Sequence, residues 1–234
     1  MDKPVALVTG ASRGIGAALA PELARRGMHV VITARTEGGL AEVDDQIREE
    51  GGSATLLPLD LLEGAGVDMI GPSVFDRFGR LDALVHNAAS LGRLTPVPHI
   101  LPTDWNAVVG VNLAACWRLI RSCAPVLMAA RRGRAVFLTD RRAAEPLAYW
   151  GAYGATKAAM EHLVLTWAQE VATSNLRVNL FDPGTVATKL RAEAMPGEDP
   201  RTLRTPQAVV PALADLCGPA ETRHGQVVHA VNPA

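Results

Sequence analysis

The sequence predicts an α/β fold in which one doubly wound parallel sheet of seven strands carries helices on both faces. Short apolar runs alternate with longer segments of helical spacing, which is the pattern of repeated strand–helix–strand units. The apolar runs are rich in Val, Leu and Ile, as strands covered on both faces should be. The predicted strands are residues 5–9, 30–33, 55–58, 83–86, 135–139, 178–181 and 226–230.

The segments between these strands are predicted helices. The clearest covers residues 153–173, where Ala159, Leu163, Trp167 and Val171 share one face. Another is expected over residues 14–26, with a kink at Pro21 because proline removes a backbone hydrogen bond. No internal repeat or Gly/Ser linker divides the chain, so we expect a single domain over residues 1–234.

Composition and charge exclude several classes of partner. The net charge is −1, so we expect no nucleic-acid partner, and the cluster of Arg131, Arg132 and Arg134 is interpreted as a solvated helix end. No run of about 18 apolar residues is present to span a membrane, and the first residues lack the layout of a signal peptide. We therefore expect a cytoplasmic protein with no membrane partner.

The three cysteines lack the spacing of a metal site. Cys116, Cys123 and Cys217 form no C-x-x-C pair and no Cys/His ligand pattern, and they lie in apolar or helical surroundings. The sequence therefore predicts free, buried thiols and no metal.

A glycine-rich turn follows the first predicted strand. Residues 9–16 read T-G-A-S-R-G-I-G and open a predicted helix. Glycines let the backbone approach a pyrophosphate, whose charge is met by free N–H groups at the helix N-terminus. The strand–turn–helix context predicts a Rossmann-like dinucleotide site. Its expected contacts are Gly10, Ser12, Arg13, Gly14, Ile15 and Gly16.

The charge at the end of the second strand favours NADP(H) over NAD(H). An acidic residue there would bind the ribose hydroxyls of NAD and repel a 2′-phosphate, whereas arginine accepts the phosphate. This strand is followed by Ala34 and Arg35, and Arg13 supplies a second cation from the turn.

Tyr153 and Lys157 are candidate catalytic residues. They are four residues apart near the start of a predicted helix and so share one face. Reduction of a carbonyl group needs a proton as hydride arrives, and we expect the Lys157 ammonium to lower the pKa of the Tyr153 phenol for that task.

With these motifs the chain resembles the short-chain dehydrogenase/reductase family over nearly its whole length. The resemblance implies that Lys157 also holds the nicotinamide ribose and that Asn112 positions a water in a proton relay. It implies homodimers or homotetramers formed partly through the helix of Tyr153, with Trp167 and Leu163 either in that interface or in the core. Further cofactor contacts implied by the resemblance are Asp60, Leu61, Asn87, Ala88, Ala89, Tyr153, Lys157, Pro183, Gly184, Val186 and Thr188.

The residue at the family's catalytic serine position is Asp140, thirteen residues before Tyr153. An ionised carboxylate only accepts hydrogen bonds, and at roughly 5 Å and a dielectric near 20 it would oppose a phenolate by about 3 kcal/mol. Three accounts stay open. Asp140 is neutralised by Arg141 or Arg142 and turned away while Thr139 supplies the hydroxyl; it stays protonated and donates; or reductase activity has been lost.

These observations predict an NADP(H)-dependent oxidoreductase that interconverts a ketone or aldehyde and an alcohol by hydride transfer. The alternative is an NADP(H)-binding protein with little or no turnover and a regulatory or structural role; nucleic-acid binding through arginines is a weaker third hypothesis. Residues 90–102 and 184–206 follow the carboxyl ends of strands and are the predicted loops for a small-molecule substrate.

Overall fold

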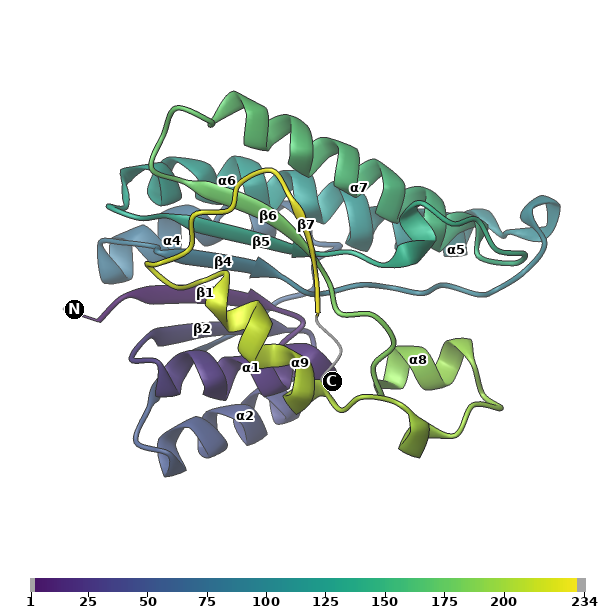
Figure 1. Ribbon diagram of the computed structural model, residues 1–234, viewed down its shortest axis with the longest axis horizontal. Helices are drawn as coiled ribbons and strands as arrows, with labels where there is room; N and C mark the ends of the chain where they lie inside the picture. Colours follow the sequence, from purple (N-terminus) through teal and green to yellow (C-terminus); the bar gives the residue numbers. More distant parts are fainter. Residues whose placement is uncertain (1–2, 231–234) are drawn as a thin grey trace.

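The computed structural model describes residues 3–230, which form a single domain around one sheet of seven parallel strands (Figure 1). The strand order β3-β2-β1-β4-β5-β6-β7 runs outward from β1 in both directions, which confirms the predicted doubly wound, Rossmann-like fold. The strands are β1 (Val5–Thr9), β2 (His29–Ala34), β3 (Ser53–Pro58), β4 (Ala83–His86), β5 (Arg134–Leu138), β6 (Arg177–Asp182) and β7 (Val227–His229).

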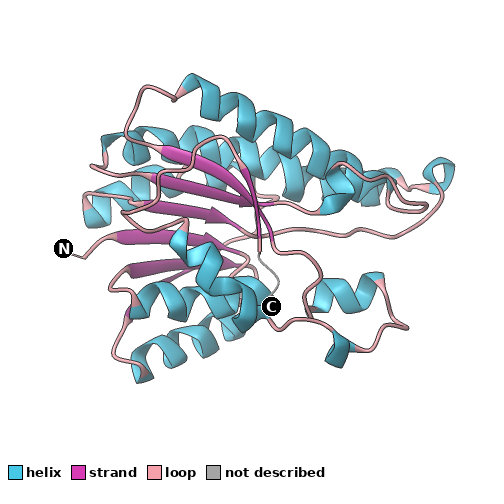
Figure 2. Ribbon diagram, in the orientation of Figure 1, coloured by secondary structure: helices cyan, strands magenta, loops and turns pink. Residues whose placement is uncertain are grey.

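Helices cover both faces of the sheet (Figure 2). One face carries α4 (Ile70–Phe78), α6 (Ala115–Ala129) and α7 (Gly151–Glu170). The other carries α1 (Gly14–Arg25), α2 (Glu37–Glu49) and α9 (Pro206–Asp215). The shorter helices are α3 (Gly64–Asp68), α5 (Pro102–Val109) and α8 (Lys189–Ala194).

Successive residues of each central strand enter opposite cores. In β1, Val5 and Leu7 pack under α4, α6 and α7, while Ala6 and Val8 pack against α1, α2 and α9. All four side chains are fully buried, and burial of this apolar surface is the main force that joins the layers.

The structure changes two details of the predicted helices. The helix of Tyr153 begins at Gly151, and its fully buried face includes Met160 and Val164, whereas Ala159 and Leu163 are only half-buried. Trp167 and Val171 of the predicted face are buried, so the prediction was wrong for Ala159 and Leu163 alone. The other helix, α1, continues through Pro21, and the kink expected there stays a prediction.

Trp167 belongs to the core. Its ring packs edge-on against Phe137 of β5, with centroids 6.2 Å apart, and only 6% of the residue is exposed. Of the two roles considered for Trp167 from the sequence, core packing is therefore the one that the structure has.

One helical run of the described chain is long and apolar enough to cross a membrane by length and composition alone. It covers Pro102–Ala129, that is α5, a short π-helical turn (Gly110–Ala114) and α6, with a mean hydropathy of 1.2. Cys116, Leu119, Cys123 and Leu127 of this run lie in the core between α4 and the sheet. Packing in the core accounts for the apolar character of these four positions, while 39% of the apolar window is buried.

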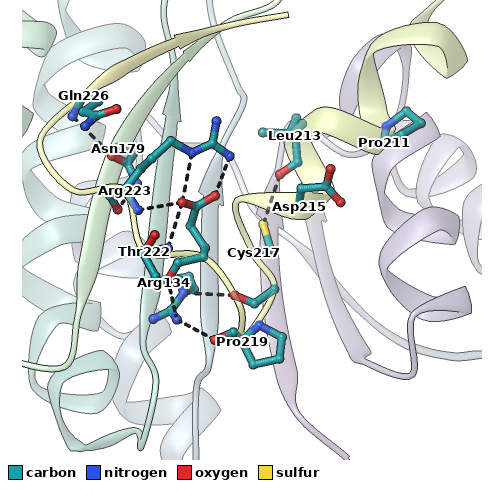
Figure 3. Close-up of polar contacts among 12 residues, drawn as sticks. Arg134, Asn179, Pro211, Leu213, Asp215, Cys217, Pro219, Thr222, Arg223 and Gln226 are labelled. Carbon is teal, nitrogen blue, oxygen red and sulfur yellow. Dashed lines mark hydrogen bonds and ion pairs between the residues drawn. The ribbon is translucent and has the colours of Figure 1, made fainter.

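The interpretation of Arg134 as part of a solvated helix end was wrong. Arg134 is 4% exposed in β5, and its guanidinium donates to the carbonyl oxygens of Gly133, Gly218, Pro219 and Glu221. Figure 3 shows Arg134 beside Pro219. Those carbonyls come mostly from the turn between α9 and β7, so the arginine ties that turn to the amino end of the sheet.

The cysteines are free and buried, as predicted. Burial raises the pKa of each thiol, Cys116, Cys123 and Cys217, to about 12. Within residues 3–230, no group of three or more His, Cys, Asp and Glu side chains is arranged to hold a metal ion.

Candidate active site

A cavity of about 580 Å³ lies where the carboxyl ends of the strands meet. Its walls are formed by residues at or just beyond the ends of β1, β2, β4, β5 and β6. Residues of α7 and of the segment before α8 also line it. All of the site residues expected from the sequence line this cavity except Gly16 and Asn112. One continuous hollow thus joins the expected dinucleotide contacts to Tyr153, Lys157 and Asp140.

The glycine-rich turn has no room for side chains at two positions. A Cβ at Gly10, whose φ is +66°, would lie 2.8 Å from the Cα of Ala88. A Cβ at Gly16 would meet the carbonyl oxygen of Gly10 and lie 2.6 Å from Nδ2 of Asn87. Gly16 thus lies behind the cavity and lets α1 pack closely against the turn.

Asn87 and Thr9 hold the turn in place. The Asn87 amide donates to the carbonyl oxygens of Thr9 and Gly10, at 3.1 and 3.0 Å. The Thr9 hydroxyl accepts the backbone N–H groups of Asn87 and Ala88 and contacts Nδ1 of His86 at 3.0 Å. Since that hydroxyl accepts two bonds, it donates to His86, whose proton then resides on Nε2.

Burial lowers the pKa of His86 to about 3, with a smaller contribution from Lys157. His86 is therefore neutral at physiological pH and acts as a structural support for Thr9. From the sequence, residue 86 was expected only as the end of a strand, so this role of His86 was missed.

Arg13 and Arg35 contribute two guanidinium groups to the wall of the cavity. Both line it, and Arg35 approaches Asp60 at 3.8 Å with 66% of its side chain exposed. Arg13 has no ion-pair partner among the described residues. The exposed residue Thr36 also lines the cavity, directly before α2, and its hydroxyl does not cap that helix.

The segment after β6 forms the opposite wall. Asp182 accepts the backbone N–H of Gly184 at 2.8 Å, and Gly184 has a φ of +67°. Thr188 caps α8 by accepting the backbone N–H of Arg191. Asp182 was missed from the sequence, although its position directly before Pro183 at a strand end was a usable signal.

Tyr153 packs in a small apolar cluster beside the cavity. The cluster contains Leu91, Trp150, Tyr153 and Ala194, and the rings of Trp150 and Tyr153 meet edge-on with centroids 5.6 Å apart. Trp150 and Leu91 were not among the expected site residues. Trp150 lies three residues before Tyr153 and so on the same helix face, which could have identified it.

Lys157 is buried and its amino group donates to the carbonyl oxygen of Leu138 at 2.7 Å. Burial lowers the pKa of Lys157 to about 8, against opposing contributions from Asp140, Cys116 and Glu161. The group is still mostly charged at pH 7 and keeps donors that Leu138 does not use.

Asp140 faces the site, which contradicts the first account of this residue. Its Oδ1 accepts the backbone N–H of Arg142 at 2.8 Å, and no Lys or Arg side chain within residues 3–230 forms an ion pair with it. Arg142 instead contacts Glu145 at 3.3 Å. The Thr139 hydroxyl donates to Glu161 at 2.5 Å and is turned away from the reacting centre.

The environment of Tyr153 raises the pKa of its phenol. Burial is the largest cause, followed by the charge of Asp140, a hydrogen bond with Asp140 and the charge of Asp182. The expectation of a lowered pKa is therefore wrong for the protein by itself, because burial and two carboxylates raise it.

Asn112 lies in the π-helical turn behind the cavity. Its side chain accepts the backbone N–H of Ser90 at 2.7 Å and donates to the carbonyl oxygen of Ser90 and the hydroxyl of Thr156. The side chain therefore joins the first substrate loop to α7, and its place in a water relay stays a prediction.

The two predicted substrate loops contribute unequally. Residues 90–92 of the first loop and residues 184–194 of the second include the lining positions, while the rest of each loop lies outside the cavity. Arg191 of α8 is held by Glu198 through two bonds of 2.6 Å, which braces the second loop.

Comparison with known proteins agrees with this geometry. The short chain dehydrogenase family matches residues 4–199. The uncharacterized oxidoreductase YciK of Escherichia coli K12 is 36% identical over 217 residues, which cover 92% of this chain and 86% of that protein. The 3-oxoacyl-[acyl-carrier-protein] reductase FabG of the same organism is 31% identical over 80% of this chain and 75% of its own length.

Solved structures show the same fold. A short chain dehydrogenase from Shigella flexneri 2a complexed with NADP has a TM-score of 0.93 at 34% identity, and the alignment covers 98% of each chain. One from Escherichia coli CFT073 complexed with NADPH has a TM-score of 0.93 at 34% identity, over 98% of this chain and 97% of the other. The family predicted from the sequence is thus confirmed: this chain belongs to the short chain dehydrogenase family and is an oxidoreductase of that type.

Proposed function

We propose that the protein is an NADP(H)-dependent oxidoreductase that interconverts a ketone or aldehyde and the corresponding alcohol in a small molecule. The observation that carries this proposal is the single cavity, in which the glycine-rich turn and the Tyr153–Lys157 pair line one hollow. Gly10 and Gly14 have positive φ values and line the cavity at the start of α1, where free N–H groups suit a pyrophosphate. A bound nicotinamide would supply or accept hydride there.

The chain's own residues then handle the proton. Tyr153 faces the cavity and delivers a proton to the developing alkoxide, while Lys157 offers its free N–H donors and its charge beside the phenol. Asp140 opposes this transfer, because a nearby carboxylate makes the phenol a weaker acid. Carbonyl reduction by this site is therefore expected to be slow compared with a site that has a neutral donor at position 140.

The preference for NADP(H) over NAD(H) rests on charge. Arg13 and Arg35 line the mouth of the cavity, and Ala34 supplies no acid that would repel a phosphate. Two structural neighbours that hold NADP and NADPH support the same assignment.

An absorbance assay of NADPH oxidation with a panel of ketones and aldehydes tests the proposal. Tyr153→Phe should lower kcat by about 100-fold or more, because proton delivery is lost, and should change the Kd for NADPH by less than about twofold. Tyr149→Phe is the matched control, since Tyr149 is 58% exposed and lies outside the lining of the cavity. Equal carbonyl reduction by wild type and Tyr153→Phe would contradict the proposal.

A second candidate function is NADP(H) binding with little or no turnover, in a regulatory or structural role. The raised pKa of Tyr153 beside Asp140 favours it. This candidate predicts tight binding of NADPH and no oxidation of NADPH with any substrate of the panel.

We also propose a homodimer or homotetramer in the cytoplasm, with no nucleic-acid or membrane partner. Exposed aromatic side chains on α5 and α6, Trp105 at 43% and Trp117 at 45%, support a contact between copies of the chain. Light scattering at several protein concentrations measures the oligomeric state. Trp117→Glu should shift the equilibrium toward the monomer.

A further inference from the structure

Asp140 presents a carboxylate to the substrate end of the cavity. It follows β5 directly and lines the cavity together with Tyr153, and its charge acts on the Tyr153 phenol. Within the described chain, the hydrogen bond of its side chain is the one that Oδ1 accepts from the backbone N–H of Arg142. A carboxylate oxygen can accept more than one bond, so Asp140 retains acceptor capacity toward the cavity.

The neighbouring hydroxyl does not compensate for this acceptor. Thr139 lies one residue earlier, but its hydroxyl donates to Glu161. A carbonyl oxygen placed beside Tyr153 would therefore face Asp140, and two acceptors without a proton between them repel. A substrate atom that carries its own hydrogen would meet the same carboxylate favourably.

Two carboxylates act on the Tyr153 phenol, and the Lys157 ammonium beside it offsets only one of them. Asp182 is a second carboxylate whose charge acts on Tyr153. The arginines that line this end are mostly engaged: Arg142 contacts Glu145 and Arg191 contacts Glu198. Arg141 is exposed, so solvent and salt screen its charge.

We infer that this site prefers a protonated carbon–nitrogen double bond, an iminium group whose N–H donates to Asp140, over a carbonyl group. The inference rests on the proposed hydride-transfer function and adds a second substrate class to it. The charge and the N–H of the iminium both match Asp140, and charge-assisted hydrogen bonds of this kind are among the strongest in proteins.

The reaction balances without a proton from the protein. The reduced nicotinamide cofactor is the reductant, and its hydride carries two electrons to the iminium carbon. The C=N π bond breaks toward nitrogen, which keeps its hydrogen and becomes a neutral amine, while the cofactor is oxidised. Tyr153 thus has no proton to deliver in this step.

The raised pKa of Tyr153 also favours an iminium group over a carbonyl group as the substrate. A weakly acidic phenol hinders reduction of a carbonyl, which must receive a proton, but it does not hinder reduction of a group that is already protonated.

The apolar cluster beside Tyr153 indicates the body of the substrate. The rings of Trp150 and Tyr153 meet edge-on, and Leu91 and Ala194 complete the cluster. A flat or cyclic hydrocarbon frame next to the reacting bond matches this wall. A bicyclic imine and a ketone of the same shape are therefore suitable probes.

The test compares 3,4-dihydroisoquinoline with 1-tetralone as substrates of the NADPH-loaded protein. Wild type should reduce the imine with a kcat/KM at least about 10-fold higher than that for the ketone. Asp140→Asn, which keeps an acceptor for Arg142 N–H, should lower imine reduction about 10- to 100-fold and raise ketone reduction, because the charge opposing Tyr153 is gone. Tyr153→Phe should lower the kcat/KM for the ketone far more than the kcat/KM for the imine.

Binding supplies a readout that does not depend on turnover. Calorimetric titration of the protein with 1,2,3,4-tetrahydroisoquinoline, which is protonated at neutral pH, should give a Kd about 10-fold lower than that for 1-tetralol, and Asp140→Asn should remove the difference. Faster ketone reduction than imine reduction in wild type would overturn the inference while leaving the proposed function in place. Loss of ketone reduction in Asp140→Asn would also overturn it, in favour of a protonated Asp140. No oxidation of NADPH with either probe, despite NADPH binding, would overturn both proposals.

Discussion

The two halves of the cavity are built in different ways. The cofactor half is made of backbone at strand ends, where Gly10 and Gly16 permit close approach and Asn87 ties two strand ends together. The substrate half is made of side chains from separate loops, such as Leu91, Asp140 and Trp150. The difference shows that a site built from backbone leaves a motif in the sequence, whereas a site built from side chains is known only once the loops are placed.

The largest effect is expected from filling the backbone cradle of the cofactor half. In Gly16→Ala, the new methyl group would meet the carbonyl oxygen of Gly10 and lie 2.6 Å from Nδ2 of Asn87. The turn must move, so NADPH affinity should fall about 100-fold or more and the free energy of unfolding by about 2 kcal/mol. Calorimetric titration and urea unfolding measure the two quantities.

Gly38→Ala is the control for that substitution. No atom lies within 4 Å of a Cβ at Gly38, so the variant should bind NADPH as wild type does and gain up to about 1 kcal/mol of stability. Equal NADPH affinity in the Gly16 and Gly38 variants would show that the cofactor half is not built on close approach.

Lys157→Met should stabilise the protein while it removes activity. Burial lowers the pKa of Lys157 to about 8 from 10.5, so the unfolded chain binds more protons between those two pH values. The free energy of unfolding of the wild type should therefore rise with pH across that window, by about 3 kcal/mol for this group. The methionine variant has no such group and should be more stable than wild type at pH 7.

Urea unfolding of both proteins at pH 7 and pH 9.5 checks this expectation. The difference between the two proteins isolates Lys157, because the buried thiols titrate equally in both. A stability difference that does not shrink as the pH rises would mean that burial of the ammonium is not costly.

A smaller effect is expected at the mouth of the cofactor half. Arg13→Ala or Arg35→Ala should each raise the Kd for NADPH about 10-fold and leave the Kd for NADH nearly unchanged, because only NADPH carries the 2′-phosphate. Arg93→Ala is the matched control, since Arg93 is 73% exposed and lies outside the cavity lining. Equal losses for NADPH and NADH would place both arginines away from the phosphate.

The smallest effect is expected from loosening the substrate half. Glu198→Gln removes the charge that holds Arg191, so α8 should become less well positioned and KM should rise about two- to threefold with kcat nearly constant. Steady-state kinetics with the best substrate of the panel measures this change. A change in NADPH affinity with constant KM for the substrate would mean that the Arg191–Glu198 pair supports the cofactor half instead.

The same distinction explains what the sequence predicted. The seven strands, the turn at Gly10 and the edge where the cavity opens follow from apolar periodicity and glycine spacing. The direction of Thr139, the contacts of Asp140 and the burial of Arg134 depend on partners 22 or more residues away or on backbone turns that no periodicity encodes. The pKa of Tyr153 was misjudged because burial, which only the fold determines, raises it.

The most direct test of the central claim is the transfer of hydride itself. The protein is incubated with NADPH that carries deuterium at both C4 positions and with the best substrate found, and the product is analysed by mass spectrometry. The account predicts one deuterium on the carbon that bore the C=O or C=N bond. A product without deuterium at that carbon, formed while NADPH is consumed, would contradict it.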